Sequence, residues 1–281
     1  MSHYHSRISA NQSWFHIPFK EVLAYKDLLW LLVKRDLTAI YKQTVLGPLW
    51  FAIPPLCTSV IFTIIFGGVA KIDTGPVPHF VFYMCGNVFW HYFVGCLNHS
   101  STSLITNAQL LRKVYFPRLV IPLYGVFVNL AHFALNFVVL LGFYLYFFFW
   151  TENEMVASPY LPLIVLLLIQ CACIGFGVGL WVAALSTKYK DFRFALPLIA
   201  QLWMWVTPIA YPAALVVKPQ LQFFLWLNPM SFVVEAVRLL FTGSGTVSLT
   251  TGAVSVGMTV LLLLSGLLVF NKVQRTFVDT I

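Results

Sequence analysis

DLLWLLVKRDLTAIYKQT at residues 27–44 is followed, after residues 45–48, by LWFAIPPLCTSVIFTIIFGGVA at residues 49–70, and this junction decides the fold class. The first stretch mixes cations and carboxylates with Leu, Trp, Val and Ile, which is typical of an amphipathic helix lying in a membrane interface. The second stretch carries no charged residue. As a helix it measures about 33 Å, enough to cross the hydrocarbon core of a bilayer. We therefore expect an interface helix that leads directly into a membrane span.

The composition extends this interpretation to the whole chain. Of 281 residues, 60% are hydrophobic and 9% are charged, and the mean hydropathy is +0.85. Soluble domains carry about 25% charged residues, so the sequence predicts an all-α integral membrane protein. Six apolar runs are candidate transmembrane helices: 49–70, 79–97, 119–149, 160–185, 194–211 and 253–270. They form a single transmembrane domain over residues 21–281, preceded by an N-terminal tail, 1–20, to which we assign no role.

A further apolar run, 221–241, differs from the six spans. It is interrupted by Asn228 and Pro229, and it contains Glu235 and Arg238. Because proline removes a backbone donor and keeps the residue before it out of a helix, we expect two short re-entrant helices before the last span. Glu235 and Arg238 have helical i,i+3 spacing and should form an ion pair that holds these two helices together. Reversing both charges should then restore the folding that either single reversal loses.

The cations predict the orientation in the membrane. Six spans place both termini on one side. If that side is cytoplasmic, only Lys71, Lys218 and Arg238 of the 17 Lys and Arg residues lie outside. This excess of Lys and Arg on one side predicts a protein of the cytoplasmic (inner) membrane whose two termini are both cytoplasmic. It also accounts for the net charge of +8 through contact with anionic membrane lipids, so no nucleic-acid partner is implied.

Several kinds of chemistry are missing from the sequence. It has no phosphate-binding G-x-x-x-x-G-K-[ST] loop, no H-E-x-x-H, no G-x-S-x-G and no paired C-x-x-C frame. We therefore expect no catalytic residue, no metal site and no enzyme activity of the chain by itself. The six spans also lack Asp, Glu, Lys and Arg, which disfavours an ion-coupled carrier. Asn129 and His132 lie on one face of the third span, where they either hydrogen-bond to neighbouring helices or line a hydrated pathway.

Several stretches within and beside these spans carry recognisable motifs. They are KYKDFRF at 188–194, QLW at 201–203, TPIAYP at 207–212 and NPMSFVVEAVR at 228–238, with RDL at 35–37, LGPLW at 46–50 and LRKVYFPR at 111–118 upstream. In this order they resemble the membrane subunit of type-2 ABC exporters for bacterial polysaccharides. The resemblance covers nearly the whole chain, from about residue 21 to residue 277.

The resemblance implies partners that the chain does not contain. It implies a homodimer of six-helix subunits joined to two copies of a separate ATPase, which would bind ATP and Mg while this chain binds no cofactor. The substrate would be a lipid-linked glycan such as an O-antigen or capsule chain. Residues 28–43 would be an interface or gate helix, and two cytoplasmic segments, 107–117 and 188–193, would contact the ATPase. The coupling residues in those two segments would be Asn107, Leu111, Arg112, Lys113 and Tyr115, and Lys188, Asp191 and Arg193.

A lipid-linked glycan suggests further candidates. Sugar rings stack on aromatic side chains, and Trp203 and Tyr211 are candidate pathway residues, although both could instead be interfacial anchors. Lys34, Arg35 and Lys42 on the amphipathic segment could bind the anionic headgroup of the substrate, or simply face solvent and lipid. The alternatives are a type-2 ABC exporter of a drug or small lipid and an integral-membrane lipid-sugar transferase. The transferase would need a cluster of acid, base or metal-binding groups, which the sequence does not display.

Overall fold

The computed structural model describes residues 19–43, 45–75, 77–114, 116–150 and 158–276, and in these residues it contains helices and loops but no β-strand. The helices are α1 (Phe19–Ala24), α2 (Lys26–Gln43), η1 (Gly47–Phe51), α3 (Ile53–Phe62), η2 (Thr63–Val69), α4 (His79–Thr106), α5 (Ala108–Lys113), α6 (Val120–Trp150), η3 (Leu161–Leu163), α7 (Ile164–Lys188), α8 (Asp191–Val206), η4 (Ala213–Leu215), α9 (Pro219–Leu227), α10 (Pro229–Thr242) and α11 (Leu249–Thr276).

Five segments are long and apolar enough to cross a membrane. They are Gly47–Val69, His79–Thr106, Val120–Trp150, Leu161–Thr187 and Leu249–Val273. A sixth candidate is the bent pair α9–α10, whose two helices meet at 90°. These segments confirm the prediction of an all-α integral membrane protein.

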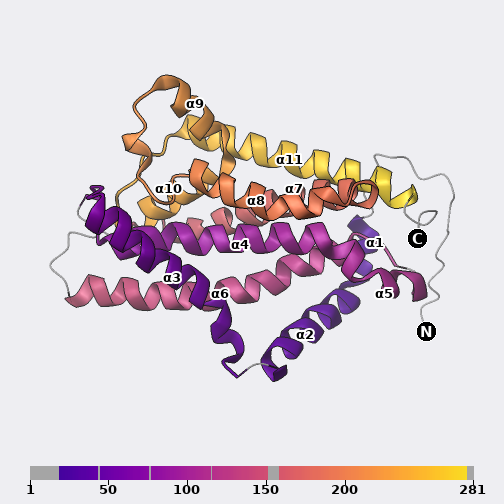
Figure 1. Ribbon diagram of the computed structural model, residues 1–281. Coiled ribbons are helices and arrows are strands. Elements are labelled where there is room, and N and C mark those ends of the chain that lie inside the picture. Colours follow the sequence, from indigo (N-terminus) through magenta and orange to yellow (C-terminus); the bar gives the residue numbers. More distant parts are fainter. Residues whose placement is uncertain (1–18, 44, 76, 115, 151–157, 277–281) are drawn as a thin grey trace.

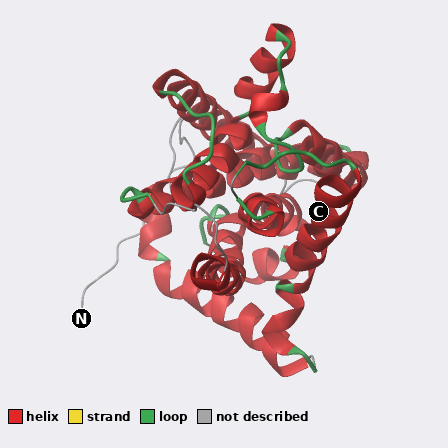
Figure 2. Cartoon of the chain, turned by 90° about the vertical axis from the view of Figure 1, so that its left-hand side faces the viewer, coloured by secondary structure: helices red, strands yellow, loops and turns green. Residues whose placement is uncertain are grey.

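The long helices run side by side and give the bundle two distinct ends (Figure 1). One end, here called the α5 end, holds α1 and α5, the end of α4 and the start of α6. The opposite end, here called the α10 end, holds α10 and the start of α4. Helix α2 runs obliquely to the bundle, and it meets the α3 segment at the lower edge of the molecule in Figures 1 and 2.

The corner between α2 and α3 lies at the predicted junction. Gly47 has a φ of +53°, a left-handed conformation that glycine adopts without a Cβ clash. Pro48 is the second residue of η1, and Pro54 lies in the first turn of α3, positions where a missing backbone donor costs little. The change from charged to apolar sequence therefore coincides with a sharp change of chain direction.

The predicted fifth span, 194–211, differs from the observed helix. Helix α8 has 16 residues and ends at Val206. Thr207, which follows it, has a ψ of 136° because Pro208 disfavours a helical conformation in the preceding residue. Tyr211 consequently lies in the loop after α8 and not on a span. The predicted re-entrant run 221–241 corresponds to α9 and α10, separated at Asn228.

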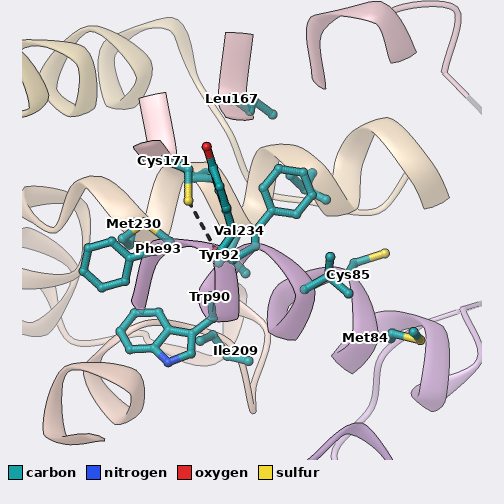
Figure 3. Close-up of a cluster of buried hydrophobic side chains, with 14 of the residues drawn as sticks. Met84, Cys85, Trp90, Tyr92, Phe93, Leu167, Cys171, Ile209, Met230 and Val234 are labelled. Carbon is teal, nitrogen blue, oxygen red and sulfur yellow. Dashed lines mark hydrogen bonds between the residues drawn. The ribbon is translucent and has the colours of Figure 1, made fainter. Parts of the chain in front are cut away.

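Small residues let α7 pack closely against two neighbours. On the α4 side, Cys171 donates a hydrogen bond to the Phe89 carbonyl at 3.3 Å (Figure 3). A methyl group added to Gly175 would lie 2.7 Å from the Phe93 carbonyl oxygen. On the α11 side, Gly177 faces Gly266 so closely that a Cβ on Gly266 would overlap the Gly177 carbonyl. Helix α7 is thus held between α4 and α11 by direct contact of helix backbones.

Candidate functional site

Two polar side chains cross the interface between α4 and α6, and each occupies space left by a glycine. Asn129 of α6 packs over Gly95 of α4, and His99 of α4 packs over Gly125 of α6. A Cβ on either glycine would overlap the opposing polar side chain. The Asn129 amide nitrogen donates to the Gly125 carbonyl at 2.8 Å. The two glycines therefore make room for polar groups within an otherwise apolar helix contact.

A pocket of about 450 Å³ opens beside this crossing, in the half of the bundle nearer the α5 end. Helix α4 contributes Gly95, Asn98, His99 and Thr102, helix α6 contributes Asn129, and helix α8 contributes Arg193, Leu196 and Pro197. Its lining thus combines one cation, amides, a hydroxyl and an imidazole with an apolar wall. The structure brings together Asn129 and Arg193, for which the sequence suggested separate roles.

A polar network next to the pocket joins α2 to α4 and α6. Asp36 accepts a hydrogen bond from Arg35 Nε at 2.8 Å, and its other oxygen lies 3.9 Å from His99 Nε2. The hydrogen bond to Asp36 raises the pKa of the Arg35 guanidinium, so Arg35 stays charged. The ring of Tyr124 on α6 packs edge-on against His99, with the centroids 4.9 Å apart. The pair Arg35–Asp36 therefore connects α2 to His99 of α4 and, through His99, to Tyr124 of α6.

The network continues to the base of α5 through Asn107. This residue precedes the first turn of α5 and is buried, and its side chain donates to the Tyr124 hydroxyl at 3.2 Å. Its carbonyl accepts the backbone N–H groups of Leu110 and Leu111 at 3.0 and 3.1 Å. Asn107 thus fixes the start of α5 to α6, although the sequence suggested a surface contact for it.

The other proposed coupling residues have different surroundings. Leu111 is partly buried against the apolar cluster under α2, whereas Lys113 and Asp191 are exposed. Arg193 is half-buried at the pocket. The side chains of Arg112 and Lys188 and the whole of Tyr115 lie outside the residues that the structure describes. Lys113 and Asp191 are therefore the described members of this set most accessible to a partner.

The three cations proposed for α2 lie on its exposed side. Lys34, Arg35 and Lys42 are exposed, while Leu32 and Val33 on the opposite side are buried against α6 and its neighbours. This is the arrangement expected of an amphipathic interface helix. The charge of Arg35 is matched by Asp36, so Lys34 and Lys42 are the two members of this set for which the structure describes no carboxylate partner.

The proposed pathway residues mostly contact neighbouring protein groups. The His132 ring stacks on Phe51, with centroids 3.5 Å apart and planes 10° apart. The Trp203 indole N–H donates to Asn228 Oδ1 at 3.0 Å, and the Tyr211 hydroxyl donates to the Val206 carbonyl at 3.2 Å. Trp203 and Tyr211 are thus hydrogen-bonded within the protein, an arrangement that neither the pathway role nor the interfacial-anchor role predicted. Asn129 alone of the four lines the pocket.

Glu235 and Arg238 form a buried pair at the α10 end. Arg238 Nη1 donates to Glu235 Oε1 at 3.0 Å, and the guanidinium also donates to the carbonyls of Pro208 at 2.6 Å and Ile209 at 2.7 Å. It lies over the Phe82 ring, 3.6 Å from the centroid. Glu235 accepts the backbone N–H groups of Ala213 at 3.2 Å and Thr246 at 3.1 Å. The pair therefore holds the loop after α8 and the loop after α10 against α4.

His99 and Tyr124 were not singled out from the sequence, and Asp36 was noted only as part of the RDL motif at 35–37. The polar run NHSSTS at 98–103 was the available signal, but it follows the predicted end of the second span and so looked like a loop. Helix α4 instead continues to Thr106 with Ser100, Ser101 and Ser103 buried. In the part of the chain that the structure describes, no three His, Cys, Asp or Glu side chains are placed to hold a metal ion.

Comparison with known proteins identifies relatives over most of the chain. A family described as "ABC-2 type transporter" matches residues 27–242. The chain is similar to an "O-antigen export system permease protein RfbA" of Klebsiella pneumoniae, with 28% identity over 90% of this chain and 94% of that protein. It is also similar to a protein of that name from Myxococcus xanthus, with 27% identity over 79% of this chain and 83% of the relative.

Proposed function

Because the chain belongs to the ABC-2 type transporter family, we propose that it is the permease subunit of an ATP-driven exporter of a lipid-linked polysaccharide of the O-antigen kind. One observation carries the choice of substrate: relatives that are named O-antigen export permeases match it over as much as 90% of its length. A drug or small-lipid exporter of the same family is less well supported, since no relative of that kind supports it. The same is true of a lipid-sugar transferase.

The energy source of this exporter is a separate ATPase that binds ATP and Mg. The chain itself has no phosphate-binding loop. Helix α5, with exposed Lys113, and the start of α8, with exposed Asp191, lie at one end of the bundle and form the surface for this partner. The charge asymmetry supports a cytoplasmic α5 end in the inner membrane, with both termini cytoplasmic.

The exporter works as a homodimer with two ATPase copies. A hydrated glycan cannot pass through the centre of one bundle, because side chains fill the space around α4 and that helix is buried over most of its length. The path for the polymer therefore runs along an outer face of the bundle. Helices α3 and α8 leave large apolar side chains exposed, including Val60, Ile61, Leu198 and Leu202, and these faces suit contact with lipid or a second copy.

The cations of α2 contribute to recognition of the anionic headgroup. Lys34 and Lys42 are exposed on an interface helix, where a cation attracts phosphate groups at the membrane surface. Arg35 contributes less, because Asp36 already matches its charge at 2.8 Å. The double variant Lys34→Gln/Lys42→Gln should therefore reduce export more than Arg35→Gln does, at equal protein level.

Deletion of the chain's gene in its source organism tests the function. We expect surface polysaccharide to disappear while lipid-linked polysaccharide accumulates inside the cytoplasmic membrane, and the wild-type gene to restore export. Lys113→Glu together with Asp191→Arg should leave the chain in the membrane but reduce the amount of ATPase that co-purifies with it. Normal surface polysaccharide in the deletion strain would refute the proposal.

A further inference from the structure

We propose that the pocket between α4, α6 and α8 is a binding site for the phosphorylated sugar that links the glycan to its lipid. The proposal rests on the function proposed above and assigns that substrate to a particular place in the subunit. Nothing in the sequence motifs singles out this place, because its residues come from three separate helices and one of its central side chains, His99, belongs to none of the motifs.

The size and position of the pocket fit this ligand. Its volume of about 450 Å³ falls within the range of about 300–1,000 Å³ that is usual for small-molecule sites. It lies in the half of the bundle nearer the α5 end, next to the Arg35–Asp36 contact of α2. A headgroup held at the interface by α2 would therefore be adjacent to the pocket.

The lining matches the chemistry of a phosphosugar. Arg193 supplies a guanidinium that can bind phosphate oxygens through two N–H groups, and the structure describes no ion pair for it. No carboxylate lines the described pocket, and the Asp36 carboxylate near His99 is paired with Arg35. Asn98 is exposed with no described hydrogen bond from its side chain, and its amide can bond to sugar hydroxyls. Leu196 and Pro197 provide an apolar wall for the lipid end of the ligand.

The polar groups beside the pocket are held in place by the fold. Asn129 is fixed by its bond to the Gly125 carbonyl, and Gly95 leaves the space that its amide occupies. His99 occupies the space over Gly125, and its Nδ1 atom is buried with no hydrogen-bond partner among the described residues. The pair of glycines thus maintains two polar side chains at the floor of the site.

Direct binding to the full-length chain in lipid nanodiscs tests the proposal. The probes are farnesyl diphosphate, farnesyl diphospho-N-acetylglucosamine and the water-soluble UDP-N-acetylglucosamine, each titrated by calorimetry. We expect Arg193→Gln to weaken binding of both farnesyl probes by about tenfold, the effect of losing a charged hydrogen bond. Asn129→Leu should weaken only the probe that carries the sugar. UDP-N-acetylglucosamine should bind much more weakly than either, because it lacks the lipid end.

Matched variants separate loss of the site from loss of the fold. Lys218→Gln removes an exposed cation at the α10 end and should bind every probe as the wild type does. Gly95→Ala should displace Asn129 and reduce binding, whereas Gly257→Ala adds a methyl group where nothing lies within 4 Å. If Gly95→Ala does not fold, the half-buried Arg193→Gln still provides the test. Thermal unfolding of each variant checks that the fold is retained.

Three results would overturn the proposal. They are absence of binding to the wild type, wild-type affinity in both Arg193→Gln and Asn129→Leu, and tighter binding of UDP-N-acetylglucosamine than of the lipid-linked probe. Each of these results refutes the pocket proposal alone, and the exporter function is still supported if the deletion strain loses surface polysaccharide. Normal export in the deletion strain would refute the function itself, whatever the pocket binds.

Discussion

Arg238 is fully buried, yet each side of its guanidinium has a partner. It donates to the carbonyls of Pro208 and Ile209 and to Glu235, and it covers the ring of Phe82. A buried cation is tolerated when it is paired and its N–H groups are satisfied. Each charge has backbone partners suited to its sign, since carbonyl oxygens surround the guanidinium while backbone N–H groups face the Glu235 carboxylate. The sequence shows the pair but not these backbone partners.

A double variant that exchanges the charges of Glu235 and Arg238 should therefore not fold. In Glu235→Arg/Arg238→Glu the new carboxylate would face the carbonyls of Pro208 and Ile209, and the new guanidinium would face backbone N–H groups. This prediction differs from the expectation from sequence that a double reversal restores folding, and the experiment decides between them. Arg238→Met alone should cost about 3–5 kcal/mol, because Glu235 is left as an unpaired buried charge. Yield of monodisperse protein and its unfolding temperature measure both effects, and recovery in the double reversal would contradict the prediction.

Trp203 illustrates how an aromatic residue near a span end can be structural. Its ring packs edge-on against Phe93, with centroids 5.0 Å apart, and its indole N–H bonds to Asn228. Asn228 in turn donates to Thr207 and accepts the Met230 N–H that starts α10. Trp203 is therefore part of the connection between α8 and α10.

Trp203→Phe should lower the unfolding temperature while export per folded molecule stays normal. The substitution keeps an aromatic ring but removes one hydrogen bond, worth about 1 kcal/mol. Trp205→Phe is the matched control, since the Trp205 ring is half exposed and no hydrogen bond from it is described. Differential scanning fluorimetry and quantification of surface polysaccharide give the two readouts. Wild-type stability with reduced export would instead place Trp203 in the glycan path.

At the scale of elements, Tyr124 on α6 joins the base of α5 to the region contacted by α2. Its hydroxyl accepts the Asn107 amide at 3.2 Å, and its ring packs against His99, which lies near Asp36. A displacement of α5 by a bound ATPase would therefore reach the interface helix through these side chains. Buried polar networks of this kind lose much of their value when one member is removed.

Tyr124→Phe should uncouple α5 from α2 without preventing assembly with the ATPase. The ring and its contact with His99 remain, but the Asn107 amide loses its acceptor on α6 and keeps only the Ser103 carbonyl. We expect the ATPase to co-purify in normal amount and the stimulation of ATP hydrolysis by lipid-linked glycan to fall. Tyr160→Phe, at an exposed position before α7, is the control. Full stimulation in Tyr124→Phe would exclude the hydroxyl from coupling.

The close contact between α7 and α4 gives a second prediction at this scale. Gly175→Ala places a methyl group 2.7 Å from a backbone oxygen of α4, which cannot move without shifting the helix. Such overpacking costs about 1–3 kcal/mol. Thermal unfolding in detergent should show a lower midpoint for Gly175→Ala than for Gly257→Ala, whose position in α11 has no neighbour within 4 Å. Equal midpoints would show that α4 and α7 separate easily.

Sequence patterns predicted the elements well where composition changes abruptly. The boundary at Gly47 and Pro48 and the broken helix at Asn228 and Pro229 both follow from proline and glycine chemistry. The extension of α4 to Thr106 was missed because a polar run normally ends a span, whereas here α6 and α7 bury its serines. The pocket was missed for a related reason: His99, Asn129 and Arg193 meet only through tertiary packing, which no local periodicity reports.

For the whole molecule, the two ends of the bundle differ in charge as well as in shape. Lys71 precedes α4 and Lys218 precedes α9, both at the α10 end, whereas the α5 end has a larger set of cations: Lys113, Arg118, Lys190, Arg193 and Lys272. Cations are retained on the cytoplasmic side during membrane insertion. The described cations therefore predict an orientation with the α5 end inside.

Cysteine labelling in membrane vesicles should detect this orientation. In a Cys57→Ser background, which removes an exposed native thiol, Lys113→Cys should react with a membrane-impermeant maleimide only in inside-out vesicles. Lys218→Cys should react only in right-side-out vesicles, because its side chain is exposed at the opposite end. The two sites report opposite faces of one molecule, so each serves as the control for the other. The reverse pattern would place α5 outside the cell, where no ATPase could reach it, and the proposed energy source would then be wrong.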